Sequence, residues 1–240
     1  MHPPAVRPEI VGPGLTREML LAGGLGDFIR KSSPETHVLT DEERANNLAA
    51  LLAERPEHGS GLWVFAYGSL MWNPLIRISE TRLAKALGWR REFCLATKGG
   101  RGSEDNPGMM LGLKPGGECH GAVLRVAEAD IALELDLLWR REMVASGYIP
   151  RWIAVVDETG ERLGHAIGFT INPQGQSYCE GLPESELVHR LATAEGRLGR
   201  ASEYLFRTRD GLRLMGITDP MLEHLGEAVE KLQRELKILT

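Results

Sequence analysis

Apolar residues along this 240-residue chain change period twice, which divides the sequence into a strand-rich middle and helical ends. Short, mostly apolar runs typical of strands occupy residues 62–67, 89–96, 109–114, 119–126, 148–156 and 162–171. Helical spacing covers 128–144 and the chain after Pro183, with breaks near 196–199 and 216–219. We therefore expect an α+β fold, in which a mixed, closed or strongly curled sheet is flanked by helices.

Turn-forming residues indicate how the strands connect. Pro115, Gly116 and Gly117 predict a hairpin that joins 109–114 to 119–126. The segment 157–160 predicts a second hairpin between the last two strands.

The first 60 residues differ from the rest, because they are rich in proline and glycine and then give one clear helix. That helix starts at Asp41, where Thr40 and Glu43 have capping-box spacing, and it stops near Pro56. We expect residues 1–60 to be an N-terminal extension packed on a domain formed by residues 61–240.

Composition narrows the functional classes. With 42% hydrophobic and 25% charged residues, the chain can bury a sizeable core without disulfides, and its three cysteines lack CxxC spacing and fit a reducing cytoplasm. A net charge of −5 without a basic tract argues against nucleic-acid binding, and the apolar run 19–22 is too short for a signal core or membrane span. The seven histidines are scattered without metal-ligand spacing, so we expect no metal.

The first apolar strand stops abruptly at the sequence Tyr67-Gly68-Ser69-Leu70, which is followed by the turn-forming residues 73–74. Glycine allows backbone conformations closed to other residues, so successive amides at 68, 69 and 70 can point at one anion or carbonyl oxygen. The pattern predicts a binding cradle, although an ordinary exit from a strand has the same appearance.

A carboxylate lies on the apolar stripe of the helix over 128–144. Glu142 shares this stripe with Ile131, Leu135 and Leu138. Burial and the negative end of the helix dipole both raise the pKa of such a group, which suits it to move protons near neutral pH.

Two further expectations concern the same helix. Glu142 is alternatively an ion-pair partner at the helix end, where Arg140, Arg141 and Arg151 are the candidate cations. Glu134 and Asp136 lie off the stripe, so we expect them in solvent.

Five motifs occur in one order between about residues 62 and 235. They are Tyr67-Gly68-Ser69-Leu70 with Trp72-Asn73-Pro74, Gly88-Trp89-Arg90-Arg91-Glu92-Phe93, Arg101-Gly102 with Pro107-Gly108, Leu138-Trp139-Arg140-Arg141-Glu142-Met143 ahead of Tyr148, and Glu203-Tyr204-Leu205. In this combination the chain resembles the ChaC-type γ-glutamylcyclotransferases. The Trp-Arg-Arg-Glu-Met form resembles the bacterial branch of that family.

The resemblance implies an enzyme that splits glutathione into 5-oxoproline and Cys-Gly without a cofactor, on a compact β-barrel-like fold. It assigns to Glu142 the role of base and then acid, and to the backbone of Tyr67 to Leu70 the grip on the γ-glutamyl group. Tyr148 and Tyr204 match family tyrosines, and each either lines the pocket or only packs.

Arg101 either binds a substrate carboxylate or is a solvated loop arginine. A cyclotransferase for other γ-glutamyl amino acids or amines, and a non-catalytic regulator that senses a γ-glutamyl ligand, are the alternative functions. The extension before residue 60 either shades the pocket or mediates self-association, and the sequence does not determine the oligomeric state.

Overall fold

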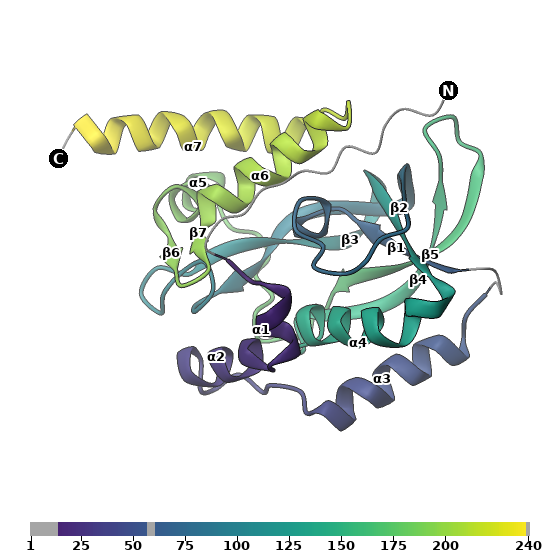
Figure 1. Cartoon of the computed structure of the whole chain (residues 1–240). Helices are drawn as coiled ribbons and strands as arrows, with labels where there is room; N and C mark the ends of the chain where they lie inside the picture. Colours follow the sequence, from purple (N-terminus) through teal and green to yellow (C-terminus); the bar gives the residue numbers. More distant parts are fainter. Residues whose placement is uncertain (1–13, 57–60, 239–240) are drawn as a thin grey trace.

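Five strands close into a barrel in a computed structural model that describes residues 14–56 and 61–238 (Figure 1). The strands are β1 (Gly61–Ala66), β2 (Glu80–Thr97), β3 (Gly108–Ala127), β4 (Tyr148–Val156) and β5 (Arg162–Ile171). Their order around the barrel is β1-β3-β2-β4-β5, and the parallel contact of Val64 with Ile167 closes it. The expected α+β fold with a closed sheet is confirmed.

The predicted hairpin at 115–117 is wrong, because β3 runs through this segment as one strand paired with β2. Leu87 lies opposite Glu118 and Trp89 opposite Pro115, which leaves Gly88 on one strand and the two glycines on the other in a bulge. All three glycines have a positive φ there. Glycines serve bulges as well as turns, and only the pairing partner distinguishes the two. The second hairpin, between β4 and β5, is confirmed.

The N-terminal region holds three helices in its described part. The predicted one is α3 (Asp41–Ala53), with both bonds of its capping box formed between Thr40 and Glu43. The sequence prediction missed α1 (Arg17–Leu21) and α2 (Gly24–Ser32). Glycines at 23, 24 and 26 disfavour a helix in isolation, so α2 depends on packing of its apolar side, where Leu25 is buried.

The helix that carries the candidate acid is α4 (Ile131–Glu142), preceded by a short 3-10 turn, η2 (Glu128–Asp130). Its Trp139 packs edge-on against Phe169 of the barrel, with ring centroids 5.4 Å apart. The indole nitrogen of Trp139 also donates to Asn47 Oδ1 of α3 at 2.8 Å. As Figure 1 shows, α4 therefore lies between the barrel and α3.

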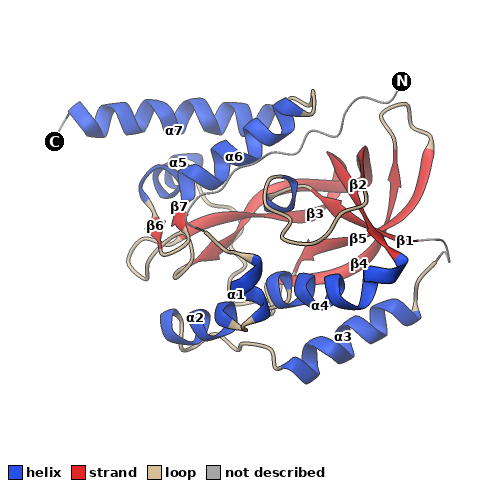
Figure 2. Cartoon of the chain, in the orientation of Figure 1, coloured by secondary structure: helices blue, strands red, loops and turns tan. Residues whose placement is uncertain are grey.

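Three more helices complete the chain: α5 (Glu184–Thr193), α6 (Ala201–Leu214) and α7 (Pro220–Ile238). The short strands β6 (Glu195–Gly196) and β7 (Gly199–Arg200) form a hairpin between α5 and α6. Figure 2 shows these helices on the other side of the barrel from α4. The helical reading and both predicted breaks are confirmed. Nowhere in 14–56 or 61–238 is a helix both long and apolar enough to cross a bilayer.

Candidate functional site

A cavity of about 660 Å³ lies where the ends of β2 and α4 meet α6 and the N-terminal helices. Its volume is within the range of small-molecule sites, about 300–1,000 Å³. The predicted site residues in its wall are Ser69, Arg101, Glu142, Tyr148 and Tyr204. Segments distant in sequence therefore converge on one site.

Glu142 is the last residue of α4, and its side chain is 13% exposed, on the cavity wall. Burial raises the pKa of this carboxyl above its usual range, although the charge and hydrogen bond of Arg141 act in the opposite direction. The predicted inward position and the ion pair both occur, since Arg141 Nε lies 2.8 Å from Glu142 Oε1. The carboxyl is thus suited to accept and return a proton.

Arg141 connects this carboxyl to the turn after β1. Its side chain is 7% exposed and donates from Nη2 to Ser69 Oγ at 2.8 Å and from Nη1 to the carbonyl of Asn73. One guanidinium therefore fixes both the acid and the turn. The sequence indicated Arg141 only as an ion-pair partner, because its contact with Ser69 joins residues far apart in the chain.

The turn after β1 includes a short 3-10 helix, η1 (Ser69–Met71). Tyr67 and Leu70 are buried in the core, where the Tyr67 hydroxyl donates to the Phe169 carbonyl at 2.6 Å. A Cβ at Gly68 would lie only 2.9 Å from the Tyr204 hydroxyl, so glycine allows this close approach. Within the described residues, the amides of Gly68 and Ser69 donate to no backbone carbonyl. Ser69 is the residue of the four that lines the cavity.

Two tyrosines both line the cavity and pack, so the two predicted roles coexist. The Tyr148 hydroxyl donates to the Leu111 carbonyl at 2.8 Å. Tyr204 is 4% exposed, and its ring meets Trp72 and Phe93 edge-on. Burial raises the pKa of Tyr204 to about 12 and that of Tyr148 well above its usual value. Both hydroxyls therefore stay protonated at neutral pH.

The alternative of a solvated Arg101 is wrong, because its side chain is only 10% exposed. Its Nη1 donates to the Arg200 carbonyl at 2.9 Å and to Glu203 Oε2 at 3.3 Å. Its guanidinium lies 5.8 Å from the centre of the Trp72 ring and 5.6 Å from that of Tyr204. Burial lowers the pKa of Arg101, against the opposing effect of Glu203. The result is a fixed guanidinium on the cavity wall.

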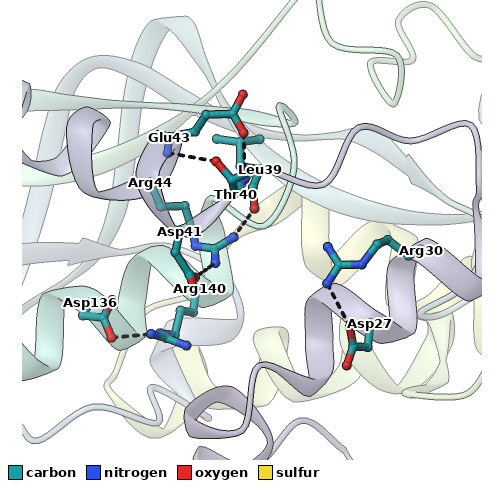
Figure 3. A network of polar contacts seen from close by, with 9 residues as sticks. All are labelled: Asp27, Arg30, Leu39, Thr40, Asp41, Glu43, Arg44, Asp136 and Arg140. Atoms are coloured by element: carbon teal, nitrogen blue, oxygen red, sulfur yellow. Dashed lines mark hydrogen bonds and ion pairs between the residues drawn. The ribbon is translucent and has the colours of Figure 1, made fainter.

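The prediction that Glu134 is in solvent is also wrong, since its side chain is fully buried. Arg17 donates to both carboxylate oxygens, at 2.6 and 2.7 Å, and the backbone amide of Arg77 donates to Oε2 at 2.9 Å. Burial alone would raise the pKa of Glu134, but these bonds outweigh it and hold the pKa below its usual range. Asp136, in contrast, is exposed as predicted, and it pairs with Arg140 (Figure 3).

Cysteines and metal-ligand residues take no visible part in this site. Cys94, Cys119 and Cys179 are free thiols. In the part of the chain that the structure describes, no three His, Cys, Asp or Glu side chains are grouped as ligands for a metal.

Comparison with known proteins places the chain beside one family. A family model described as "ChaC-like protein" matches residues 62–232. The glutathione-specific gamma-glutamylcyclotransferase of Escherichia coli (strain K12) is 39% identical over 201 residues, which cover 84% of this chain and 86% of that protein. The glutathione-specific gamma-glutamylcyclotransferase 1 of Rattus norvegicus is 30% identical over 176 residues, covering 71% and 79%.

A solved structure shows a similar fold. The crystal structure of the yeast gamma-glutamyl cyclotransferase specific to glutathione aligns with a TM-score of 0.66 at 21% sequence identity. The alignment covers 72% of this chain and 97% of that one.

Proposed function

Because the chain belongs to the ChaC-like protein family, we propose that it cleaves glutathione to 5-oxoproline and Cys-Gly. The observation that carries the proposal is Glu142, a carboxyl with a raised pKa on the wall of a cavity of small-molecule size. The names of the Escherichia coli and rat relatives, both glutathione-specific, support glutathione as the substrate. The free thiols support a reducing compartment, and we assign the activity to the cytoplasm.

The proposed reaction needs one group that moves a proton twice. The α-amine of the γ-glutamyl unit gives a proton to Glu142, and its nitrogen attacks the γ-amide carbonyl carbon to close a five-membered ring. The bond from that carbon to the cysteine nitrogen then breaks, and Glu142 returns the proton to the leaving nitrogen. No atoms enter or leave apart from the two products. Since the attack is intramolecular, holding the substrate folded supplies much of the acceleration.

Arg141 and the turn after β1 support this chemistry. Arg141 holds the carboxylate of Glu142 in one orientation and fixes Ser69 beside it. The amides of Gly68 and Ser69 donate to no backbone carbonyl within the described residues and are available to bind the γ-glutamyl group or the oxyanion that develops on its amide. Each well-placed donor to such an oxyanion stabilises the transition state by about 3 kcal/mol. Leu70 supports the turn from the core.

Three other side chains complete the proposed pocket. Tyr148 and Tyr204 keep their hydroxyl protons at neutral pH, so neither acts as a base. Tyr148 already donates its proton to the Leu111 carbonyl and offers the substrate its oxygen as an acceptor, whereas Tyr204 can donate to the substrate. Arg101 carries a positive charge on the cavity wall, which suits a substrate carboxylate.

The test is to incubate the purified full chain with glutathione and to quantify 5-oxoproline by mass spectrometry. γ-Glutamylalanine and γ-glutamylmethylamide are compared at equal concentration. We expect 5-oxoproline from glutathione with the highest kcat/KM of the three. A higher kcat/KM with the other compounds would identify a cyclotransferase of other specificity. Binding of glutathione without any 5-oxoproline would contradict catalysis and favour a regulator.

A further inference from the structure

Part of the cavity wall comes from outside the family match, which begins at residue 62. Residues 14–39, here called the N-terminal strap, include α1 and α2 and contribute lining residues from both helices. We infer that the N-terminal strap contacts the leaving-group half of the substrate and so determines which γ-glutamyl compounds bind. This inference rests on the proposed function, because it takes the γ-glutamyl end to lie at Glu142.

Both ends of the N-terminal strap are attached next to the catalytic elements. At one end, the amide of Leu39 donates to the carbonyl of Val144 at 3.0 Å, two residues after Glu142. At the other end, Asn73 Nδ2 donates to the Leu15 carbonyl at 3.2 Å, in the segment that Arg141 also fixes. The strap therefore runs from one side of the catalytic carboxyl to the turn after β1.

An ion pair with a fully buried carboxylate holds the strap to α4. Arg17 of α1 reaches both oxygens of Glu134, and its Nη1 also donates to the Leu75 carbonyl at 2.8 Å. Three separate segments thus meet at Glu134, whose side chain is fully buried. Such a connection ties α1 to both α4 and the segment after the β1 turn.

The middle of the strap presents an apolar helix face to the cavity. Leu25, Phe28 and Ile29 of α2 line it, and Leu25 is 7% exposed. A Cβ built on Gly99 would overlap Ser32 Oγ and lie 3.6 Å from Phe28 Cζ, so α2 touches the loop that leads to Arg101. The proton-moving carboxyl comes from α4 and further polar groups come from α6 and the turn after β1, whereas α2 supplies apolar surface.

The two sides of the cavity suit different halves of the substrate: the polar side around Glu142 suits the γ-glutamyl unit, and the apolar face of α2 suits the leaving group. The α-amine must reach Glu142, and the carbonyl carbon of the amide that breaks becomes part of the same five-membered ring, so the γ-glutamyl unit stays beside the carboxyl. Only groups beyond that amide nitrogen extend to α2. An apolar face there suits the cysteinyl portion of glutathione and offers nothing to a γ-glutamyl compound with a one-carbon leaving group.

The experiment compares binding of glutathione and γ-glutamylmethylamide, measured by NMR titration of the full-length Glu142→Gln protein, which prevents turnover. We expect Phe28→Ala in this background to weaken glutathione binding about 10-fold and γ-glutamylmethylamide binding less than 2-fold. Ile29→Ala serves as the second variant if Phe28→Ala does not fold. The matched control is Arg30→Ala, on the outer side of α2, where Arg30 pairs with Asp27 (Figure 3). It should change neither affinity by more than 2-fold.

Equal loss for both ligands, or no loss for glutathione, would overturn the inference. Turnover by the wild-type chain is measured separately as 5-oxoproline release. A selective loss of glutathione affinity in Phe28→Ala, with no 5-oxoproline released by the wild type, would refute the proposed function while supporting the inferred role of the N-terminal strap in substrate binding. Turnover by the wild type with unselective binding changes would do the reverse.

Discussion

Glu134 and Glu142 lie two turns apart on the same helix, and both are carboxylates in the protein interior, yet they have opposite properties. Glu134 accepts three hydrogen bonds, two of them from one guanidinium, and its pKa is held low. Within the part of the chain that the structure describes, Glu142 pairs with one cation, Arg141; it faces the cavity, and burial keeps its pKa high. The number of partners that meet a buried carboxylate therefore separates a structural ion pair from a proton carrier.

The largest effect should follow from removing the proton carrier. Glu142→Gln keeps the shape of the side chain but cannot accept a proton, so we expect kcat for glutathione to fall about 10³-fold or more. The free energy of unfolding should change by less than about 1 kcal/mol, because burial of the Glu142 charge costs more than its pairing with Arg141 gains, as its raised pKa indicates, and the amide oxygen of Gln can still accept from Arg141. Rates of 5-oxoproline formation and urea unfolding measure the two quantities. Retention of a tenth of the activity would exclude Glu142 as the proton carrier.

The reverse pattern should follow at Glu134. Glu134→Gln deprives Arg17 of its charge partner, and we expect a loss of about 3 kcal/mol in unfolding free energy, the order found for broken buried ion pairs. The fraction that remains folded should keep kcat within about 5-fold. Asp136→Asn is the matched control, since its ion pair with Arg140 is exposed and should contribute less than about 0.5 kcal/mol.

The double substitution Arg17→Met with Glu134→Leu sharpens the test at this site. It replaces the pair with apolar groups and should recover most of the lost stability in urea unfolding. A loss below 1 kcal/mol for Glu134→Gln alone would place this pair with ordinary surface ion pairs.

A smaller effect concerns pH, because Glu142 should control the pH dependence of activity and Glu134 that of stability. Because the base form of Glu142 is required, kcat/KM should fall as pH drops through its raised pKa, above the usual value of about 4.3. The lowered pKa of Glu134 gives stability that is present above the pKa of an unfolded glutamate and is lost only as pH falls through the lower folded value. Activity should therefore disappear at a higher pH than folded structure does, as followed by kinetics and circular dichroism.

Arg141 allows a direct control of this pH profile. Its charge and hydrogen bond lower the pKa of Glu142, so Arg141→Gln should move the acid limb of kcat/KM to higher pH. Arg141→Lys keeps the charge and should restore part of the shift. An acid limb that stays in place in Arg141→Gln would show that Arg141 does not control the titration of Glu142.

Local patterns predicted those features that depend on near neighbours in the chain. The capping box of α3 and the β4–β5 hairpin were predicted from a few adjacent residues and are confirmed. The bulge at 115–117 was mistaken for a turn, because glycine permits both and the pairing with β2 decides. The burial of Glu134 was missed because α4 has a second buried side, formed by a segment more than one hundred residues earlier.

By itself the sequence determined the α+β class, the order of the motifs and the inward position of Glu142, since hydrophobic periodicity and family resemblance are both properties of the linear chain. Only the tertiary structure decided that Arg141 joins Glu142 to Ser69, that Arg101 is buried against two rings, and that the N-terminal strap walls the cavity. These contacts bring together residues distant in sequence. Their geometry depends on closure of the barrel and the docking of helices around it, which no local pattern specifies.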